Sequence, residues 1–278
     1  MIDYPMPVSE LFSDLKIGLC PKCGLGAVLS QIDAQRLHLY YEQDYAKLAK
    51  RHQRPAPAAY FADPAHMFKP QRSRSQLRLA ASHLSCTPRR ILDLGAGFGT
   101  TLHLARAEFW PEAELTAIEP DLSMAPYLHT VGAEVVPGIE QAAQNSYNLI
   151  IASHVLEHYQ AFEIMELLHS VRKLLAPRGI VVAEVPNSDF AAYPDIAGHS
   201  HEPHLLFFSQ ESFTSLFKAC GLPILFASTV GSLRYRGLVA GVVEKLRRRL
   251  AGGSEYGVHR SAVRIVAGAP RHDEMSRS

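Results

Sequence analysis

Short apolar runs alternate with longer segments of mixed polarity from residue 90 onward. Each run is four to seven residues long and is bounded by glycine, proline or polar residues, which is typical of buried strands. Five such runs come before residue 190, at 91–94, 114–119, 133–136, 147–153 and 180–185. Because a segment long enough for a helix separates most of them, the pattern predicts a parallel sheet with helices on both faces.

Helices are predicted before and between these strands, at 71–85, 100–108, 122–130 and 161–175. The last of these segments has apolar residues near helical spacing, which predicts one buried face. That predicted face consists of Phe162, Met165, Leu168, Val171 and Leu175. The turn Pro177-Arg178-Gly179 is expected to end this helix before the fifth strand begins.

The C-terminal part follows a different pattern. Two strand-like runs, 222–228 and 262–268, are separated by a basic stretch with glycine breaks. Consecutive late strands predict antiparallel pairing at one edge of the sheet. The predicted fold is therefore α/β, with a doubly wound, mostly parallel seven-stranded sheet and an antiparallel edge strand. A small N-terminal appendage is expected over 1–70 and the main domain over 71–278, with a basic helical insertion at about 232–257.

Composition narrows the class of protein. A chain of 278 residues with 47% apolar and 20% charged residues is ordinary for a soluble globular protein. The net charge of +1 gives no reason to expect a nucleic-acid partner. The first residues lack a basic start and an apolar core, and no apolar run approaches the roughly 20 residues that span a bilayer. Four cysteines are too few for a disulfide scaffold, so a cytoplasmic protein is expected.

The stretch DLGAGFGT follows the first predicted strand and contains Gly95, Gly97 and Gly99. A dinucleotide fingerprint would place its third glycine at position 100, where this chain has Thr100. A nicotinamide-dependent oxidoreductase is therefore disfavoured but remains an alternative. A P-loop is excluded more firmly, because no Lys-Ser or Lys-Thr pair follows the glycines.

Two carboxylates sharpen the choice of ligand. Asp93 lies two residues before Gly95, where a pyrophosphate would gain nothing from a negative charge. Glu119 ends the second strand, at the position from which an acid reaches ribose hydroxyls. Together they favour a nucleoside that carries positive charge and no phosphate. S-adenosylmethionine is such a molecule.

The segments DLGAGFG, AIEPD, SHVLEH and LLAPRGIVVAEVPN resemble, in this order, the motifs of class I S-adenosylmethionine-dependent methyltransferases, over roughly residues 75–230. The resemblance implies that Asp93 and the loop glycines contact the methionyl part, that Glu119 takes the ribose hydroxyls, and that 137–140 neighbours the adenine. One departure is Asn148, where the family commonly has Asp. The expected cofactor-binding residues are Asp93, Gly95, Gly97, Gly99, Glu119, Pro120, Ile139 and Ser153.

Histidines gather where the acceptor of the methyl group is expected. His154 and His158 follow the fourth strand, and GHSHEPHLLFFS, at 198–209, follows the fifth. The second loop resembles that of sugar and polyketide-glycoside methyltransferases, which implies that His204 acts as the catalytic base, with His158 and His154 as further candidates. Pro203 stands where that branch has Glu, which weakens the case for C-methylation. A zinc site in His-x-His-x-x-His is an alternative, as are ordinary solvated histidines.

The N-terminal part contains Cys20-Pro-Lys-Cys23-Gly24, which is half of a zinc ribbon. The same sugar-methyltransferase branch carries an N-terminal zinc-binding region, so the resemblance implies structural zinc on Cys20 and Cys23. Zinc normally takes four ligands, and the candidates to complete the set are His38, Cys86 and Cys220. The alternative is a turn with two free thiols. The segment 40–45, YYEQDY, lies beside the acceptor in that branch, or it packs in the core.

Residues 234–250 carry six basic residues and one Glu. They are interpreted either as a helix that contacts a membrane surface or an acidic protein, or as a solvated basic face. The predicted function is S-adenosylmethionine-dependent methyl transfer to a small-molecule acceptor, with a sugar or glycolipid intermediate as the expected class. A second alternative, from another functional class, is a scaffold that binds S-adenosylmethionine without catalysis.

Overall fold

The computed structural model describes residues 1–4, 10–41, 53–188, 203–233, 256–257 and 260–270. Several predictions fall outside these ranges and are not tested by the structure. They are most of the acceptor segment 40–45, His199, His201 and Glu202 of the second histidine loop, and the basic stretch 234–250 with most of its insertion.

The central sheet confirms the predicted fold class. Its strand order is β11-β10-β12-β8-β7-β4-β5-β6. The neighbouring strands β8, β7, β4, β5 and β6 are parallel to one another. Strand β12 runs antiparallel to both of its neighbours, β8 and β10. The two-residue strand β11 extends the predicted seven strands at the edge. The strands are β4 (Arg90–Leu94), β5 (Glu114–Ile118), β6 (Glu134–Val136), β7 (Tyr147–Ser153), β8 (Leu175–Pro186), β10 (Ile224–Leu233), β11 (Tyr256–Gly257) and β12 (Arg260–Gly268).

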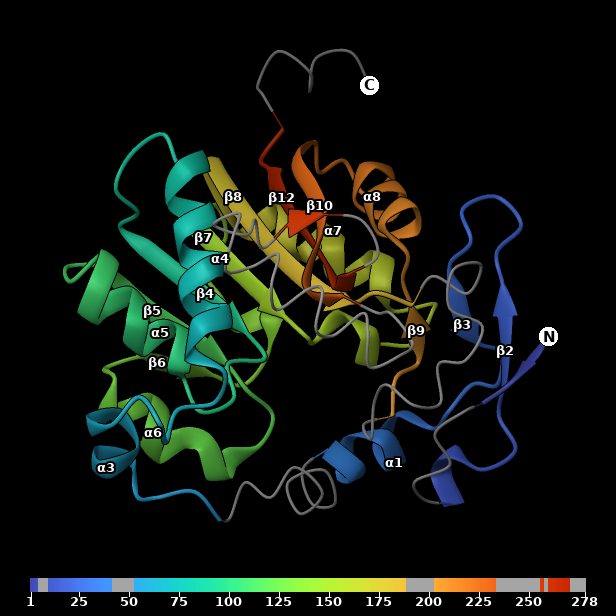
Figure 1. Ribbon diagram of the computed structural model, residues 1–278, viewed down its shortest axis with the longest axis horizontal. Coiled ribbons are helices and arrows are strands. Elements are labelled where there is room, and N and C mark those ends of the chain that lie inside the picture. Colours follow the sequence, from blue (N-terminus) through green and yellow to red (C-terminus); the bar gives the residue numbers. More distant parts are fainter. Residues whose placement is uncertain (5–9, 42–52, 189–202, 234–255, 258–259, 271–278) are drawn as a thin grey trace.

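Helices cover both faces of this sheet (Figure 1). One buried cluster lies on the side of α7 (Ile164–Leu174) and α8 (Gln210–Ala219). The other lies on the side of α4 (Pro70–His83), α5 (Thr100–Leu104) and α6 (Ala125–Thr130). Short turns complete these elements: η4 (Ala105–Phe109), which is π-helical, η5 (Leu122–Met124), η6 (Ile139–Gln141) and η7 (Leu156–His158). Of the helices in the described ranges, none combines the length and apolar character needed to span a bilayer.

The helix α7 differs in detail from its prediction. It begins at Ile164, so Phe162 lies before it and is 57% exposed, and Met165 also faces outward. The buried face is set by a neighbouring stripe, which consists of Ile164, Leu167, Leu168, Val171 and Leu174. The predicted face was therefore wrong at its first two positions, because an apolar residue before the helix start was counted in its spacing.

The predicted turn at 177–179 lies inside a strand. Strand β8 begins at Leu175, directly after α7, and Arg178 has a φ of +63°. The register between β7 and β8 shifts here, since Tyr147 pairs with Leu175 while Leu149 pairs with Ile180. The segment is therefore a bulge within β8, and it lets the strand bend without ending it.

The N-terminal part forms a second, smaller sheet. Strands β1 (Ile2–Asp3), β2 (Lys16–Leu19) and β3 (Gly26–Val28) pair in this order, and β9 (Leu206–Phe207) pairs with β3. The short helices are η1 (Glu10–Phe12), α1 (Ala34–Leu39) and α3 (Pro57–Ala62). Phe12 and Ile17 pack in one buried cluster with Leu205 and Phe207. A strand from beyond residue 200 thus completes the N-terminal sheet, directly after His204.

Candidate active site

A cavity of about 190 Å³ lies at the carboxyl ends of the central strands, where an open α/β sheet binds its ligands. The glycine loop after β4, the end of β7, and residues before and within the start of α4 surround it. Its lining consists of Arg54, Phe68, Lys69, Arg72, Ser73, Asp93, Gly95, Ala96, Gly97, Phe98, Thr100, Thr101, Ser153 and His154. The lining therefore combines three basic side chains with the carboxylate of Asp93 and the open backbone of the glycine loop.

Asp93 stands one residue before the end of β4 and is 3% exposed. Burial, together with the nearby charge of Glu119, raises the pKa of its carboxyl group to about 8. The charged form of Asp93 is therefore costly without a counter-charge. A ligand that brings positive charge into the cavity would stabilise that form.

The loop glycines have two distinct functions. Gly95 has a φ of +72°, and a side chain on it would lie 2.8 Å from Val155. Gly97 has a φ of +52°, and a Cβ on it would meet nothing within 4 Å. Gly95 is thus required by packing, whereas Gly97 leaves open space above the backbone where a ligand can approach closely.

Glu119 follows the end of β5 and is buried. Its Oε2 accepts a hydrogen bond of 2.7 Å from the backbone N–H of Gly97, and its Oε1 accepts one of 3.1 Å from Asp121. Glu119 therefore fixes the glycine loop at the point where the loop borders the cavity.

Three other predicted cofactor residues lie outside the lining of the cavity. Gly99 is the N-cap of α5, and its Cα faces Leu128. Pro120 is exposed at the end of β5, and Ile139 is half-buried at the start of η6. The structure brings Asp93, Gly95, Gly97 and Ser153 together around one cavity. Gly99, Glu119, Pro120 and Ile139 are not among its lining residues.

A buried polar network lies behind the cavity. Arg264 of β12 stands opposite Glu184 of β8 in the sheet, and its Nε donates to Glu184 Oε2 at 2.6 Å. Gln76 of α4 donates to the same oxygen at 3.0 Å and to Ser153 Oγ at 2.7 Å. The hydrogen bond with His154 and the charges of Arg264 and Arg72 hold the pKa of Glu184 well below its usual range, although burial alone would raise it. An ionised carboxylate is thereby placed next to the end of β7.

His154 connects this network to the cavity. Its φ of +56° is rare for a residue with a side chain, and such backbone conformations concentrate at functional sites. Its two ring nitrogens each lie 3.3 Å from a carboxylate, Nδ1 from Glu157 and Nε2 from Glu184. Burial lowers the pKa of His154, but the two carboxylates outweigh it and raise the pKa overall.

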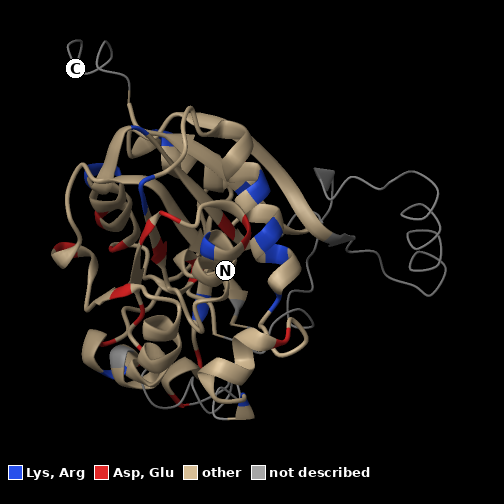
Figure 2. Cartoon of the chain, turned by 90° about the vertical axis from the view of Figure 1, so that its left-hand side faces the viewer, with Lys and Arg blue, Asp and Glu red and all other residues tan. Residues whose placement is uncertain are grey.

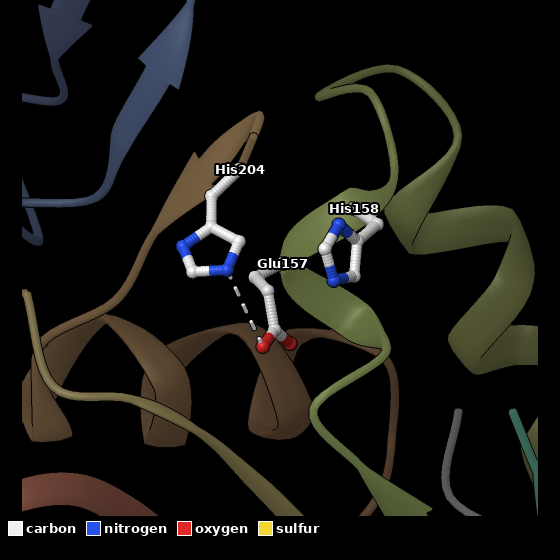
Figure 3. Close-up of side chains that lie close together, drawn as sticks. All are labelled: Glu157, His158 and His204. Carbon is white, nitrogen blue, oxygen red and sulfur yellow. Dashed lines mark ion pairs between the residues drawn. The ribbon is translucent and has the colours of Figure 1, made fainter. Parts of the chain in front are cut away.

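Beyond His154 lie the two other predicted histidines, and they converge on Glu157 (Figure 3). His158 belongs to η7, and its ring is 5.1 Å from that of His204, which precedes β9. The Nε2 of His204 lies 4.0 Å from Glu157 Oε1. Burial and the neighbouring His158 together lower the pKa of His204 to about 3, although Glu157 acts in the opposite direction. The structure thus gathers His154, His158 and His204 around one carboxylate.

Comparison with known proteins identifies the family. The profile of a methyltransferase domain matches residues 34–225, which is more than half of the chain. The chain belongs to this methyltransferase family. With the cavity described above, it is a class I S-adenosylmethionine-dependent methyltransferase.

Solved structures of low sequence identity share the methyltransferase fold. One is 1,6-didemethyltoxoflavin-N1-methyltransferase of Burkholderia thailandensis, with bound 1,6-didemethyltoxoflavin and S-adenosylhomocysteine. It is 15% identical, with a TM-score of 0.53, and the match covers 91% of this chain and 98% of that chain. Another comes from the complex between the Haloferax volcanii Trm112 methyltransferase activator and a methyltransferase. It is 15% identical, with a TM-score of 0.55, over 77% of this chain and 97% of that chain. These likenesses concern the fold.

The [4+2]-cyclase SpnF also has this fold, with 19% identity and a TM-score of 0.51 over 72% of this chain and 82% of that chain. A curated relative is the hybrid PKS-NRPS synthetase buaA of Petromyces alliaceus, 29% identical over 165 residues. That match covers 50% of this chain and 4% of the relative. Since one fold carries such different chemistries, the reaction has to be argued from the site.

The methyltransferase's own residues fit S-adenosylmethionine. When bound, this cofactor supplies a methyl group activated by a positively charged sulfur. The buried carboxylate of Asp93 suits a cation, and the open backbone at Gly97 admits a ligand that lies against the loop. Arg54, Lys69 and Arg72 also line the cavity, and their positive charge suits a carboxylate.

The Cys20-Cys23 knuckle forms a turn after β2. The N–H of Gly24 donates to Cys20 O at 2.9 Å, and both thiols are half-buried. Cys86 is exposed and Cys220 is buried, and in the described ranges neither joins the knuckle in a group of three ligands. Zinc at Cys20 and Cys23 therefore stays a prediction.

Sequence reasoning missed the residues that support the histidines. Glu184 and Arg264 each place a charge within an otherwise apolar strand, IVVAEV and AVRIVAG, and this was a visible signal. Charged residues are almost never fully buried unless they are paired, so two such strands predict a pair. Gln76 and the basic residues of the cavity wall gave no comparable signal, because they lie in polar segments.

Proposed function

We propose that this methyltransferase transfers the methyl group of S-adenosylmethionine to a small-molecule acceptor that must lose a proton, and that the acceptor is a sugar or glycolipid intermediate. One observation carries the proposal. The cavity that Asp93, Gly95 and Gly97 border is also lined by Ser153 and His154, and His154 leads directly into the histidine group. Cofactor-type and proton-accepting groups thus share one cavity.

The cofactor half is assigned as follows. Asp93, Gly95 and Gly97 face the methionyl part, and Glu119 accepts from the ribose hydroxyls. Gly99, Pro120 and Ile139 support this half from outside the cavity lining, Gly99 by starting α5 and Ile139 by packing beside the expected adenine position.

The acceptor half is assigned to His154, His158 and His204. The acceptor's nucleophilic atom forms a bond to the methyl carbon as the carbon–sulfur bond breaks, and its proton passes to a base. His154 is the member of the group that lines the cavity, and it is flanked by two carboxylates that stabilise its protonated form. His204, the base predicted from the sequence, lies behind Glu157 and remains a candidate.

The cofactor assignment is tested by Gly97→Val, with Gly24→Val as a matched control. Both glycines have a positive φ and open space above them, but only Gly97 borders the cavity. Gly97→Val should abolish calorimetric binding of S-adenosylhomocysteine, since the branched side chain fills the ligand's space, while Gly24→Val binds as wild type does. Equal binding by both variants would remove the proposed cofactor site.

The acceptor class is tested by S-adenosylhomocysteine formation over a panel of nucleotide sugars, glycosides, glycolipids, phenols and amines. Turnover with at least one sugar-containing acceptor is expected, and mass spectrometry then locates the methyl group. Turnover confined to phenols or amines would refute the sugar proposal and leave the methyltransferase assignment intact.

A further inference from the structure

Ser153 and Glu184 lie side by side near the carboxyl ends of β7 and β8, where they are paired in register. Ile151 and Val182, two positions before them, pack in the cluster on the α4 side of the sheet. Because side chains alternate along a strand, Ser153 and Glu184 point to that same side. There they meet Gln76 of α4, whose amide bridges the two.

The amide of Gln76 has one orientation that its neighbours allow. Its Nε2 donates to Ser153 Oγ at 2.7 Å and to Glu184 Oε2 at 3.0 Å, and the latter oxygen also accepts from Arg264. A flipped amide would place Oε1 against this acceptor oxygen. Gln76 is 1% exposed, and within the described residues its Oε1 is buried without a hydrogen-bond partner. The site thus leaves a buried carbonyl unpaired while both N–H groups stay fixed, and such an exception calls for an explanation.

The hydroxyl of Ser153 is left with a proton to donate. Its oxygen accepts from Gln76, and among the described residues this is the one hydrogen bond that the hydroxyl makes. Because Gln76 occupies one lone pair of the oxygen, the O–H bond is turned away from Gln76. Ser153 is half-buried and lines the cavity, so the proton is available to a ligand there.

Ser153 directly precedes His154, and both residues line the cavity. In the proposed function His154 is the base that lines the cavity, so an acceptor atom that gives its proton to His154 comes within reach of the Ser153 hydroxyl. The backbone of His154 is fixed as well, because its N–H donates to Glu184 O at 2.7 Å. A fixed hydrogen-bond donor and a base therefore stand next to each other at the end of one strand.

We propose that Ser153 binds the acceptor at the atom that is methylated, that this atom is an oxygen, and that Gln76 positions the Ser153 hydroxyl for this task. The inference rests on the proposed function and names the nucleophile within it. The sequence predicted Ser153 as a cofactor-binding residue, whereas this assignment places it on the acceptor. Ser153 is then a catalytic residue and Gln76 a positioning residue.

An oxygen nucleophile can use both groups in one step. One lone pair of the oxygen forms the bond to the methyl carbon, and the carbon–sulfur bond breaks with its electron pair passing to sulfur. The proton of the acceptor passes to His154, and a further lone pair of the oxygen accepts from Ser153. A neutral amine has a single lone pair, which the methyl carbon takes, so it cannot accept from Ser153 at the same time. The donor therefore aligns an oxygen and offers an amine nothing.

The first test uses the full-length protein and the acceptor of the panel that wild type methylates fastest. Ser153→Ala removes the donor, so kcat should fall about 10–100-fold, the usual cost of lost alignment. Calorimetric affinity for S-adenosylhomocysteine should stay within about twofold, which also shows that the variant is folded. Ser153→Thr keeps a hydroxyl and should retain most of the activity. Ser82→Ala, which changes an exposed serine of α4, is the matched control and should behave as wild type does.

Gln76→Leu tests the positioning role. It should lower kcat while leaving the affinity for S-adenosylhomocysteine near that of wild type. In the double variant Gln76→Leu/Ser153→Ala the loss should be smaller than the product of the two single losses, because part of the effect of Gln76 passes through Ser153. Losses that multiply fully would show that Gln76 does not act through Ser153, and would refute its positioning role.

The position of the new methyl group decides the choice of nucleophile. Mass spectrometry and NMR of the product should find it on oxygen, with phenol methylated faster than aniline and methyl glucoside faster than its amino-sugar counterpart. A sugar methylated on nitrogen or carbon would overturn this inference and leave the proposed function standing, whereas an O-methylated phenol alone would do the reverse. Weakened S-adenosylhomocysteine binding in Ser153→Ala, or no turnover with any oxygen nucleophile of the panel, would also overturn it.

Discussion

Two buried carboxylates, Asp93 in the lining of the cavity and Glu157 next to His154, have pKa values that shift in opposite directions. Asp93, on the glycine-loop side, is 3% exposed and has a pKa raised to about 8. Glu157, on the histidine side, is 1% exposed and has a pKa lowered to about 2, because neighbouring imidazoles outweigh the effect of burial. Burial alone would raise both values. Positive charge from a ligand would therefore stabilise the ionised form of Asp93, whereas neighbouring imidazoles already stabilise the ionised form of Glu157.

The distribution of charge in the chain agrees with this contrast. Helix α4 contains three arginines and no acidic residue, and Figure 2 shows the acidic positions of the chain in red, away from the helix that carries several blue positions. On the histidine side the acidic groups are paired internally, as Glu184 is with Arg264. On the glycine-loop side Asp93 has another carboxylate, Glu119, as a neighbour. Substitutions on the histidine side and on the glycine-loop side test the two parts of the site separately.

The largest effect is expected from the histidine side. His154→Ala and His204→Ala should each lower kcat by ~10²–10⁴, the usual contribution of a positioned acid or base. Cofactor affinity should change little in His204→Ala, because that residue lies behind Glu157. Single-turnover kinetics and calorimetry measure the two quantities separately. If His204→Ala slows turnover by less than tenfold while His154→Ala abolishes it, His204 takes no part in the acceptor's chemistry.

The next effect concerns stability. Arg264→Leu leaves Glu184 buried without its closest partner, which should lower the free energy of unfolding by about 3–5 kcal/mol. The double variant Arg264→Leu/Glu184→Leu removes both charges and should recover much of that loss. Chemical denaturation followed by circular dichroism measures it. Equal destabilisation in the single and double variants would show that the pair does not act through charge.

The pKa of Asp93 predicts a pH dependence of cofactor binding. Its value of about 8 in the folded protein exceeds the ~3.9 of an unfolded chain, so its stabilising contribution is complete below pH ~4 and is lost as the pH rises through about 8. A cationic ligand favours the ionised form, so affinity for S-adenosylmethionine should rise by up to about tenfold per pH unit between pH 6 and 8. Asp93→Asn should abolish this slope in calorimetry. An equal slope in both proteins would mean that another group titrates.

The smallest effect is expected at the ribose position. Glu119→Ala should weaken S-adenosylmethionine by about 1–3 kcal/mol, the cost of losing a charged hydrogen-bond acceptor. The same change frees the N–H of Gly97, which Glu119 now binds. Glu119→Gln keeps one acceptor oxygen and should lose less. Equal affinity of wild type, Glu119→Gln and Glu119→Ala would place the ribose elsewhere.

Sequence reasoning reached the glycine-loop side because its parts are close together in the chain. Asp93, Gly95 and Gly97 follow one strand, and strand order alone brings Glu119 beside them. The histidine side was reached in part. The sequence showed that histidines are frequent in these two segments. Their meeting at Glu157 depends on contact between η7 and the residues before β9, and His158 and Pro203, which form one such contact, are 45 positions apart. No local pattern encodes that distance.

The misassigned helix face has a similar origin. Spacing predicted Phe162 and Met165 as buried, yet the helix begins at Ile164, and where it begins depends on tertiary contacts. The N–H of Ile32, in the N-terminal part, donates to the Gln160 side chain at 2.9 Å and fixes the segment before α7. A partner more than a hundred residues away thus helps to set the start of a helix whose own periodicity is clear.

The pairing of Gly26 with Phe207 gives the N-terminal sheet an unusual place in the order of folding. Residues 1–28 are synthesised well before their last strand partner, which follows about 180 residues later in the chain. Such a distant contact closes a long loop and forms late. His204 lies two residues before the start of that partner strand, and its backbone carbonyl accepts a hydrogen bond from Tyr4, which is 200 residues earlier in the chain. The cofactor loop can therefore assemble on the nascent chain well before the histidine group, so a protein able to bind its cofactor precedes one able to act on an acceptor.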